Sequence, residues 1–310
     1  MVLVDWKDIA MGGMTSDIVI QRDILREVIY RKADLLSVGT KLLPTRNFGV
    51  LDVKFEFPSE FVGEYPVPEG AMGKLEKIVW TPFNVSLEKC HVHYLITDEA
   101  KARQLENYQR QMGLKRASEA MAVQMDSHIL DMIIAGPYAT NTVTVAAGDE
   151  WNSGGADVDI DSNVGNAINN ILSNSNVNLE DIANINMVVP APVYGELKKL
   201  RLIGNVQQKL LDYFKSVYGL GIYPTRYTDA ISGKAAGISD DAYIVVNTDD
   251  AGIIGSFEPQ GGMNIPLTEE RRQFGVGDEF LFTRYFKAKI QPYSSTDATS
   301  RLIAKIANVC

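Results

Sequence analysis

The feature that most constrains the fold is a long helical pattern between residues 98 and 136. Apolar side chains recur there at spacings of three and four residues, the period of one helix face. They are Met121, Met125, Ile129, Met132 and Ile133. Asp98 suits the positive end of the helix dipole, and Gly136-Pro137 ends the pattern. A continuous helix of this length would extend about 55 Å. We therefore predict a helix that serves as the spine of the molecule.

The segment from 48 to 96 has a strand-like pattern. Alternating apolar residues occur at both of its ends, and a stretch rich in Pro and Gly lies between them. This pattern predicts one long β-hairpin with an irregular tip. The tip has too few apolar residues to form a core, and an isolated two-stranded hairpin is marginally stable in water. We therefore expect this arm to need a partner surface.

Helical and strand patterns alternate irregularly along the rest of the chain. Helices are expected at 17–37, 161–175, 192–202 and 206–218. Strands are expected at 142–147, 185–189, 242–246 and 280–290. The irregular order argues against a doubly wound parallel sheet and favours a mixed α+β fold.

Charge is distributed unevenly along the chain. The net charge is −9, so a dedicated nucleic-acid binder is not expected, because neutralising phosphates requires a basic surplus. The 81 residues from 117 to 197 contain eleven acidic residues and no Lys or Arg, while residues 22–46 carry six basic and three acidic residues. These segments are either ordinary solvated faces or two surfaces with different surroundings.

The cysteine count and the N-terminal sequence exclude several protein classes. Cys90 and Cys310 are too few for a disulfide framework or a four-cysteine zinc module. Residues 1–8 lack the cationic and apolar segments of a signal peptide, and no apolar run of about 20 residues occurs. We expect a soluble intracellular protein with reduced thiols and no membrane partner.

A metal site on the strand pattern near residue 90 is not expected. His91 and His93 are two residues apart and share one strand face, whereas Cys90 points to the other. Asp157-x-Asp159-x-Asp161 resembles the start of a calcium loop but lacks the required Gly and final Glu. It is expected to be an alternating exposed edge, with a weak surface cation site as the alternative.

No catalytic or cofactor-binding residues are expected either. The sequence contains no GxSxG, GxxxxGK[ST] or GxGxxG motif. His128 lies between Asp126 and Asp131, but no nucleophile lies at a recognisable spacing, so a structural hydrogen bond is favoured. The methionines at 121, 125 and 132 are expected to pack in a core or between subunits rather than to line a binding groove.

The order of these elements resembles that of the HK97-fold major capsid proteins of tailed viruses and proviruses. The helix Asp98–Ala135 resembles the family's spine helix, and the hairpin resembles its extended loop, which lies across a neighbouring subunit. The block from Met187 to Leu197 resembles the strand and helix of the axial domain, and Phe280–Gln291 resembles the long returning strand. The resemblance covers nearly the whole chain.

The resemblance implies a division of the chain into five segments. They are an N-terminal arm (1–47), an extended hairpin loop (48–96), a peripheral domain with the spine helix (97–141), an axial domain (142–275), and a peripheral segment with the returning strand and C-terminus (276–310). Many family members begin with a long scaffolding segment, for which residues 1–47 leave no room. Scaffolding would therefore be a separate protein, a cleaved segment or unnecessary.

The resemblance implies a structural protein without enzymatic activity, cofactor or metal. Its copies would form pentamers and hexamers of an icosahedral shell that encloses double-stranded DNA through nonspecific contacts, with the acidic stretch limiting adhesion of the DNA. Scaffolding, portal or decoration proteins would be further partners. The location would be the virion, after assembly in the host cytoplasm. Some relatives cross-link subunits through Lys and Asn, for which Lys54, Lys74, Lys77 and Asn308 are the weak candidates here.

Three other functions stay open from the sequence. An encapsulin-like nanocompartment uses the same fold to enclose a cargo enzyme, although the long hairpin favours a virus. A tail or sheath protein and a soluble α/β enzyme are more remote, and the enzyme would need a pocket with convergent polar groups.

Overall fold

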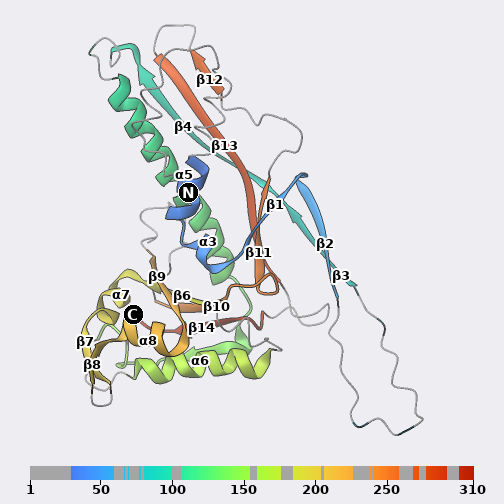
Figure 1. Ribbon diagram of the computed structural model, residues 1–310, viewed down its shortest axis with the longest axis vertical. Coiled ribbons are helices and arrows are strands. Elements are labelled where there is room, and N and C mark those ends of the chain that lie inside the picture. The colour runs from blue at the N-terminus through green and yellow to red at the C-terminus, as the bar shows by residue number, and fades with distance from the viewer. Residues whose placement is uncertain are drawn as a thin grey trace.

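The computed structural model describes residues 29–58, 66, 69, 77, 80–99, 103, 106–153, 159–175, 184–203, 206–225, 238, 240–257, 268–271, 277–291 and 300–310. A long helix and a long narrow sheet form one part of the elongated molecule, and a second sheet with three helices forms the other (Figure 1). The fold is therefore mixed α+β, as predicted.

The first sheet is built on β13 (Gly277–Ile290), its longest strand. β4 (Glu88–Thr97) pairs antiparallel with one edge of β13 over ten residues. β12 (Thr268–Arg271) and β11 (Gly252–Phe257) pair antiparallel with the other edge, and β1 (Thr45–Phe48) runs parallel to β11. The predicted strand at 280–290 is confirmed and is three residues longer at its start.

The long helix α5 (Glu106–Ile134) packs along this sheet. Its 29 residues span about 43 Å. The predicted apolar face is buried in the first core, where Met121, Met125 and Ile129 are fully inaccessible to solvent, together with Phe280 and Phe282 from β13. The helix ends just before Gly136-Pro137, as predicted. Asp98 and Glu99 are helical too, and the Arg103 amide donates to the Glu99 carbonyl at 3.1 Å, which agrees with the predicted start near 98.

The second sheet has the strand order β5-β14-β10-β6-β9. Its strands are β5 (Thr142–Thr144), β14 (Ile303–Ala307), β10 (Ala242–Val246), β6 (Ile185–Pro190) and β9 (Gly221–Thr225). β10 is buried at all five positions, as predicted for a central strand. Alternate residues of β10 contribute to different cores: Ile244 contributes to the second core and Tyr243 to the core around α5.

Helices α6 (Ile160–Asn174), α7 (Ala191–Leu197) and α8 (Leu210–Tyr218) cover the face of the second sheet that lines the second core. Two predicted helices are shorter than expected. The segment 192–202 stops being helical at Leu197, and the segment 206–218 begins with a strand. A small hairpin of β7 (Leu200–Ile203) and β8 (Val206–Lys209) separates α7 from α8. Cross-strand pairing therefore overrides the helical periodicity of these residues.

The N-terminal part of the described chain lies against α5. Residues 29–36 are helical, which confirms part of the predicted helix at 17–37; residues 17–28 lie outside the described ranges. The short helix α3 (Gly39–Leu42) follows and leads into β1. No helix in the described part of the chain is both long and apolar enough to cross a membrane.

Candidate functional site

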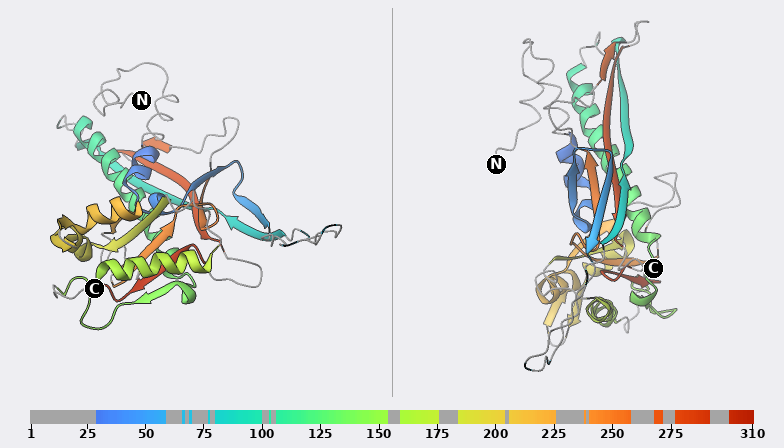
Figure 2. Two further views of the ribbon diagram at one scale, coloured as in Figure 1. Left: turned by 60° about the horizontal axis from the view of Figure 1, so that its bottom comes forward. Right: turned by 90° about the vertical axis from the view of Figure 1, so that its right-hand side faces the viewer.

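A two-stranded hairpin extends from the body of the molecule. β2 (Asp52–Pro58) and β3 (Trp80–Ser86) pair with each other, and neither joins a larger sheet among the described residues. Figures 1 and 2 show both strands pointing away from the two sheets. Two isolated strands are marginally stable in water, so this hairpin gains stability from any surface that covers it.

Among the residues that the structure describes, the hairpin contacts the body near its base. Val85, Leu87 and Ile253 form a small buried cluster there, and Lys289 Nζ donates a hydrogen bond of 3.0 Å to the Asn84 carbonyl. Leu51, at the start of the hairpin, leaves 40% of its surface exposed. The base therefore sets the direction of the hairpin, while the strands beyond it are available to another molecule.

The predicted boundary of this hairpin is wrong at its second end. The sequence pattern extended the second strand through His93, but the pairing with β2 ends at Ser86. The following strand, β4, pairs with β13, nearly 190 residues later in the chain. Alternation identified β4 as a strand but carried no information on its partner.

The carboxylate of Asp126 anchors the N-terminal arm to α5. Asp126 is fully buried and accepts hydrogen bonds from the Ser37 hydroxyl (2.5 Å), the Val38 amide (3.0 Å) and the Gly39 amide (2.8 Å). The two amides belong to the start of α3, where helical N–H groups have no partner in the helix. A Cβ on Gly39 would lie 2.5 Å from Ile129 Cδ1, so glycine is required for this close approach. The sequence associated Asp126 with His128, and this arm contact was missed.

A second anchor connects the arm to β13. The Arg284 guanidinium is 6% exposed and forms an ion pair of 2.6 Å with Asp34 Oδ1. It also lies over the Tyr30 ring, whose hydroxyl donates to the Thr283 carbonyl. This contact was missed as well, although one sequence signal was present. Arg284 occupies an inward position of an alternating strand, between Phe282 and Phe286, where a charge needs a buried partner.

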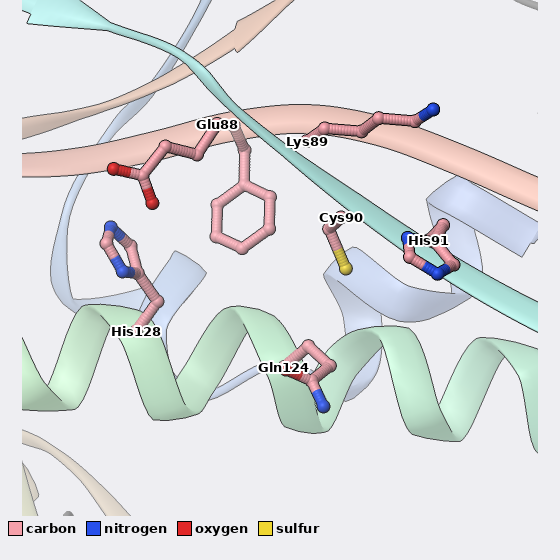
Figure 3. A pocket seen from close by; sticks show the side chains of 7 residues that line it. Glu88, Lys89, Cys90, His91, Gln124 and His128 are labelled. Atoms are coloured by element: carbon pink, nitrogen blue, oxygen red, sulfur yellow. The ribbon is translucent and has the colours of Figure 1, made fainter.

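A pocket of about 350 Å³ opens between β4 and α5 (Figure 3). Its lining residues are Glu88, Lys89, Cys90, His91, Gln124, His128 and Phe286. Figure 3 shows the Glu88 carboxylate and the His128 ring facing each other, while His91 lies toward the other end of the pocket. Glu88 also forms an ion pair of 2.5 Å with Lys287, and the His128 ring contacts Phe286 edge-on. The structure thus brings His128 beside β4, which the sequence did not predict.

The pocket residues are not arranged as a metal site. Cys90 packs against the first core, and burial raises the pKa of its thiol above the ordinary value, while His91 and His93 are exposed. The predicted opposite orientation of Cys90 is confirmed. Within the described ranges, no group of three His, Cys, Asp or Glu side chains could hold a metal ion.

Asp159 and Asp161 of the acidic motif lie at the start of α6 rather than on an exposed strand edge. Asp159 accepts a hydrogen bond of 3.0 Å from the Ser162 amide and caps the helix. Asp161 accepts hydrogen bonds from the hydroxyls of Tyr213 and Tyr218 on α8, and Asp157 lies outside the described residues. The expectation of an alternating edge is therefore wrong, because the carboxylates stabilise a helix start.

The methionine stripe packs in the core, as expected. Met121 and Met125 are fully buried, and Met132 packs against the same cluster. The cross-linking candidates are far less constrained. Lys54 and Lys77 are exposed near the hairpin, Asn308 is exposed after β14, and Lys74 lies outside the described residues.

A family comparison identifies the chain. The family model described as phage capsid protein matches residues 94–295, well over half of the chain. The protein belongs to this phage capsid family. A comparison with curated proteins finds no matching sequence. The matched region begins within β4 and continues through α5, four strands of the second sheet and β13, so it contains most of both cores of this capsid protein; β14 lies beyond it.

Solved structures show the same fold over nearly the whole length. A phage-related protein from Bordetella bronchiseptica RB50 is 13% identical, with a TM-score of 0.60 over 91% of this chain and 96% of that one. The capsid of a native GTA particle is 8% identical, with a TM-score of 0.60 over 90% and 91%. A virus-like particle from Pyrococcus furiosus is 12% identical, with a TM-score of 0.55 over 92% and 98%. The capsid protein described here therefore has the HK97-like fold that the order of elements predicted.

Proposed function

We propose that this capsid protein is the major shell protein of a tailed virus or provirus. Copies of the chain assemble through pentamers and hexamers into a closed icosahedral shell that encloses double-stranded DNA. The observation that carries this proposal is the β2–β3 hairpin, which extends away from both cores of its own chain. A neighbouring copy supplies the surface that covers it.

The proposal divides the chain broadly in the way the family resemblance implied, with the boundaries changed where the strand pairing requires it. Residues 1–47 are the arm, the hairpin extends from 48 to about 86, and β4 joins 97–141, β11, β12 and β13 in the peripheral domain. The axial domain consists mainly of residues 142–246, and β14 near the C-terminus completes its sheet. The role is structural, without catalysis, and the contacts with DNA are nonspecific. The protein acts in the virion after assembly in the host cytoplasm.

The first test is particle size. The full chain is expressed alone and studied by light scattering and negative-stain imaging. Sixty copies of a 34.2 kDa chain give a minimum of about 2 MDa for a complete icosahedral shell. Shells, or rings of five or six subunits, support the proposal. A protein that stays monomeric or dimeric at high salt and in crowding agents refutes it.

A shortened hairpin tests the observation itself. The variant joins Val53 to Val85 through an Asn-Gly turn, which suits a two-residue hairpin loop. Both cores are retained, so the thermal midpoint of the isolated protein should change little, while assembly should be lost. Full-size shells of the shortened variant would show that the hairpin does not carry assembly.

A nanocompartment is the second candidate. The similarity to a virus-like particle keeps it open, because a particle of that kind need not enclose a genome. Shells isolated from the natural host and treated with nuclease distinguish the two candidates. Protected DNA of uniform length supports the virus, whereas one abundant enclosed protein supports the nanocompartment.

A further inference from the structure

The outward face of α6 is free of charge. The helix buries Ile160, Val164, Ala167, Ile168 and Ile171 against the second sheet. Its most exposed residues follow one stripe on the other side, which we term the neutral face: Ser162, Asn166, Asn169, Leu172 and Ser173. In Figure 1 the helix lies along one border of the molecule, and the left view of Figure 2 shows it in front of the second sheet.

Helix stability does not explain this composition. Exposed helix positions are best filled by Lys, Glu, Gln or Arg, whereas Asn has a lower helix propensity because its amide competes for backbone hydrogen bonds. Asn166 and Asn169 make no side-chain hydrogen bond with the described part of the chain. Asn174, at the end of the same helix, donates to Asn141 Oδ1 at 2.8 Å and to the Thr140 carbonyl at 3.2 Å. The Asn166 and Asn169 amides therefore do not stabilise the described part of the chain through side-chain hydrogen bonds, as Asn174 does.

The absence of charge indicates the kind of partner. A nucleic acid would require Lys or Arg on this face, and a basic partner would require Asp or Glu. Copies of a chain with a net charge of −9 repel one another, so contacts between copies favour areas without uncompensated charge. The buried centres of protein interfaces are depleted of charged residues for the same reason. Leu172, 41% exposed, adds an apolar group to the stripe.

We propose that the neutral face of α6 contacts a second copy of this chain within the shell, an inference that rests on the proposed function. A 15-residue helix is about 22 Å long. One helix face of that length is much smaller than the roughly 800 Å² per partner of a stable interface. The neutral face is therefore one part of a larger contact, which persists because many copies engage at once in a closed shell.

Three paired variants of the full chain test the proposal. N166K/N169K and N166E/N169E place charge of either sign on the neutral face, and N166A/N169A is the matched control without charge. Each is first compared with wild type by thermal melting of the unassembled protein. The protein concentration that gives half-maximal assembly is then measured by light scattering.

Both charged variants should melt like wild type and should need at least about tenfold more protein for assembly, because either charge is buried at the contact without a partner. The alanine variant should assemble within about threefold of wild type. Wild-type-like assembly of either charged pair overturns the proposal. Improved assembly with Lys and impaired assembly with Glu also overturns it, because that result indicates that an acidic surface, rather than an uncharged surface of a second copy, covers the face. Failure of the wild type itself to assemble refutes the proposed function and this inference together.

Discussion

Replacing Asp126 tests how the arm is held to the rest of the molecule. In Asp126→Asn, one carboxylate oxygen becomes an amide NH₂ group of nearly the same shape. If the amide takes the place of Oδ2, it faces the Val38 N–H, so two donors meet in a buried site. The carbonyl oxygen can still accept from Ser37 and Gly39, which both bond to Oδ1.

The expected cost follows from these bonds. A lost hydrogen bond to a charged group costs about 1.5–3 kcal/mol, and a buried donor without an acceptor costs about 1–3 kcal/mol. We expect Asp126→Asn to lower the free energy of unfolding by about 2 kcal/mol. Asp126→Ala removes the acceptor of all three donors and should cost about 4 kcal/mol. Both losses are large against a typical total of about 5–15 kcal/mol.

The assay is equilibrium unfolding of the unassembled protein in urea, combined with hydrogen exchange of the Val38 and Gly39 amides. Ser37→Ala is the matched comparison, because it removes one donor to the carboxylate, at a cost of about 1.5–3 kcal/mol, while both amide hydrogen bonds to Asp126 remain. The Val38 amide should exchange much faster in both Asp126 variants, the Gly39 amide much faster in Asp126→Ala, and both amides only slightly faster in Ser37→Ala. An Asp126→Asn protein within about 0.5 kcal/mol of wild type, with unchanged exchange of both amides, would refute the anchoring role.

Three further predictions concern other contacts. Arg284→Met should increase protease cleavage within the arm, because Asp34 on the arm loses its ion-pair partner. An unchanged cleavage pattern would contradict this. Gly113→Ala should cost about 1–3 kcal/mol, since a Cβ there would lie 2.5 Å from Tyr94 Cε2; urea unfolding measures it, and a neutral effect would contradict the close packing. Burial raises the pKa of both Tyr138 and Tyr243 above 10. The neutral phenols therefore stabilise the folded state fully below the unfolded pKa near 10, and this stabilisation is lost as the pH rises toward the folded pKa values. The thermal midpoint should fall above about pH 10, and it should fall less steeply in a variant with Phe at both positions.

Local sequence patterns predicted the elements in which buried residues recur at a regular spacing. Three elements follow from the residues within them: the buried side of α5, the continuous apolar strand β10 and the alternating strand β13. In each, the spacing of apolar residues matches the positions that a core buries. The methionine stripe was assigned to packing for the same reason. The opposite orientation of Cys90 and His91 also followed from the two-residue period of a strand.

Contacts between distant segments could not be predicted in this way. Nothing near Asp126 indicates that the amides of residues 38 and 39 will reach it, since the contact joins positions nearly 90 residues apart. The partner of β4 is likewise set by β13, and the strand from 200 to 203 exists only because 206–209 pairs with it.

The sequence by itself determined most of the helical and extended segments, their apolar faces, and the order of elements that resembles a capsid protein. These properties depend on the spacing of neighbouring residues. The tertiary structure alone decided that the arm is held by Asp126 and Arg284, that the hairpin ends at Ser86, and that α6 presents a neutral face outward. Those properties depend on which distant groups come into contact. Only these long-range contacts decide whether a buried charge is paired and whether a buried donor finds an acceptor.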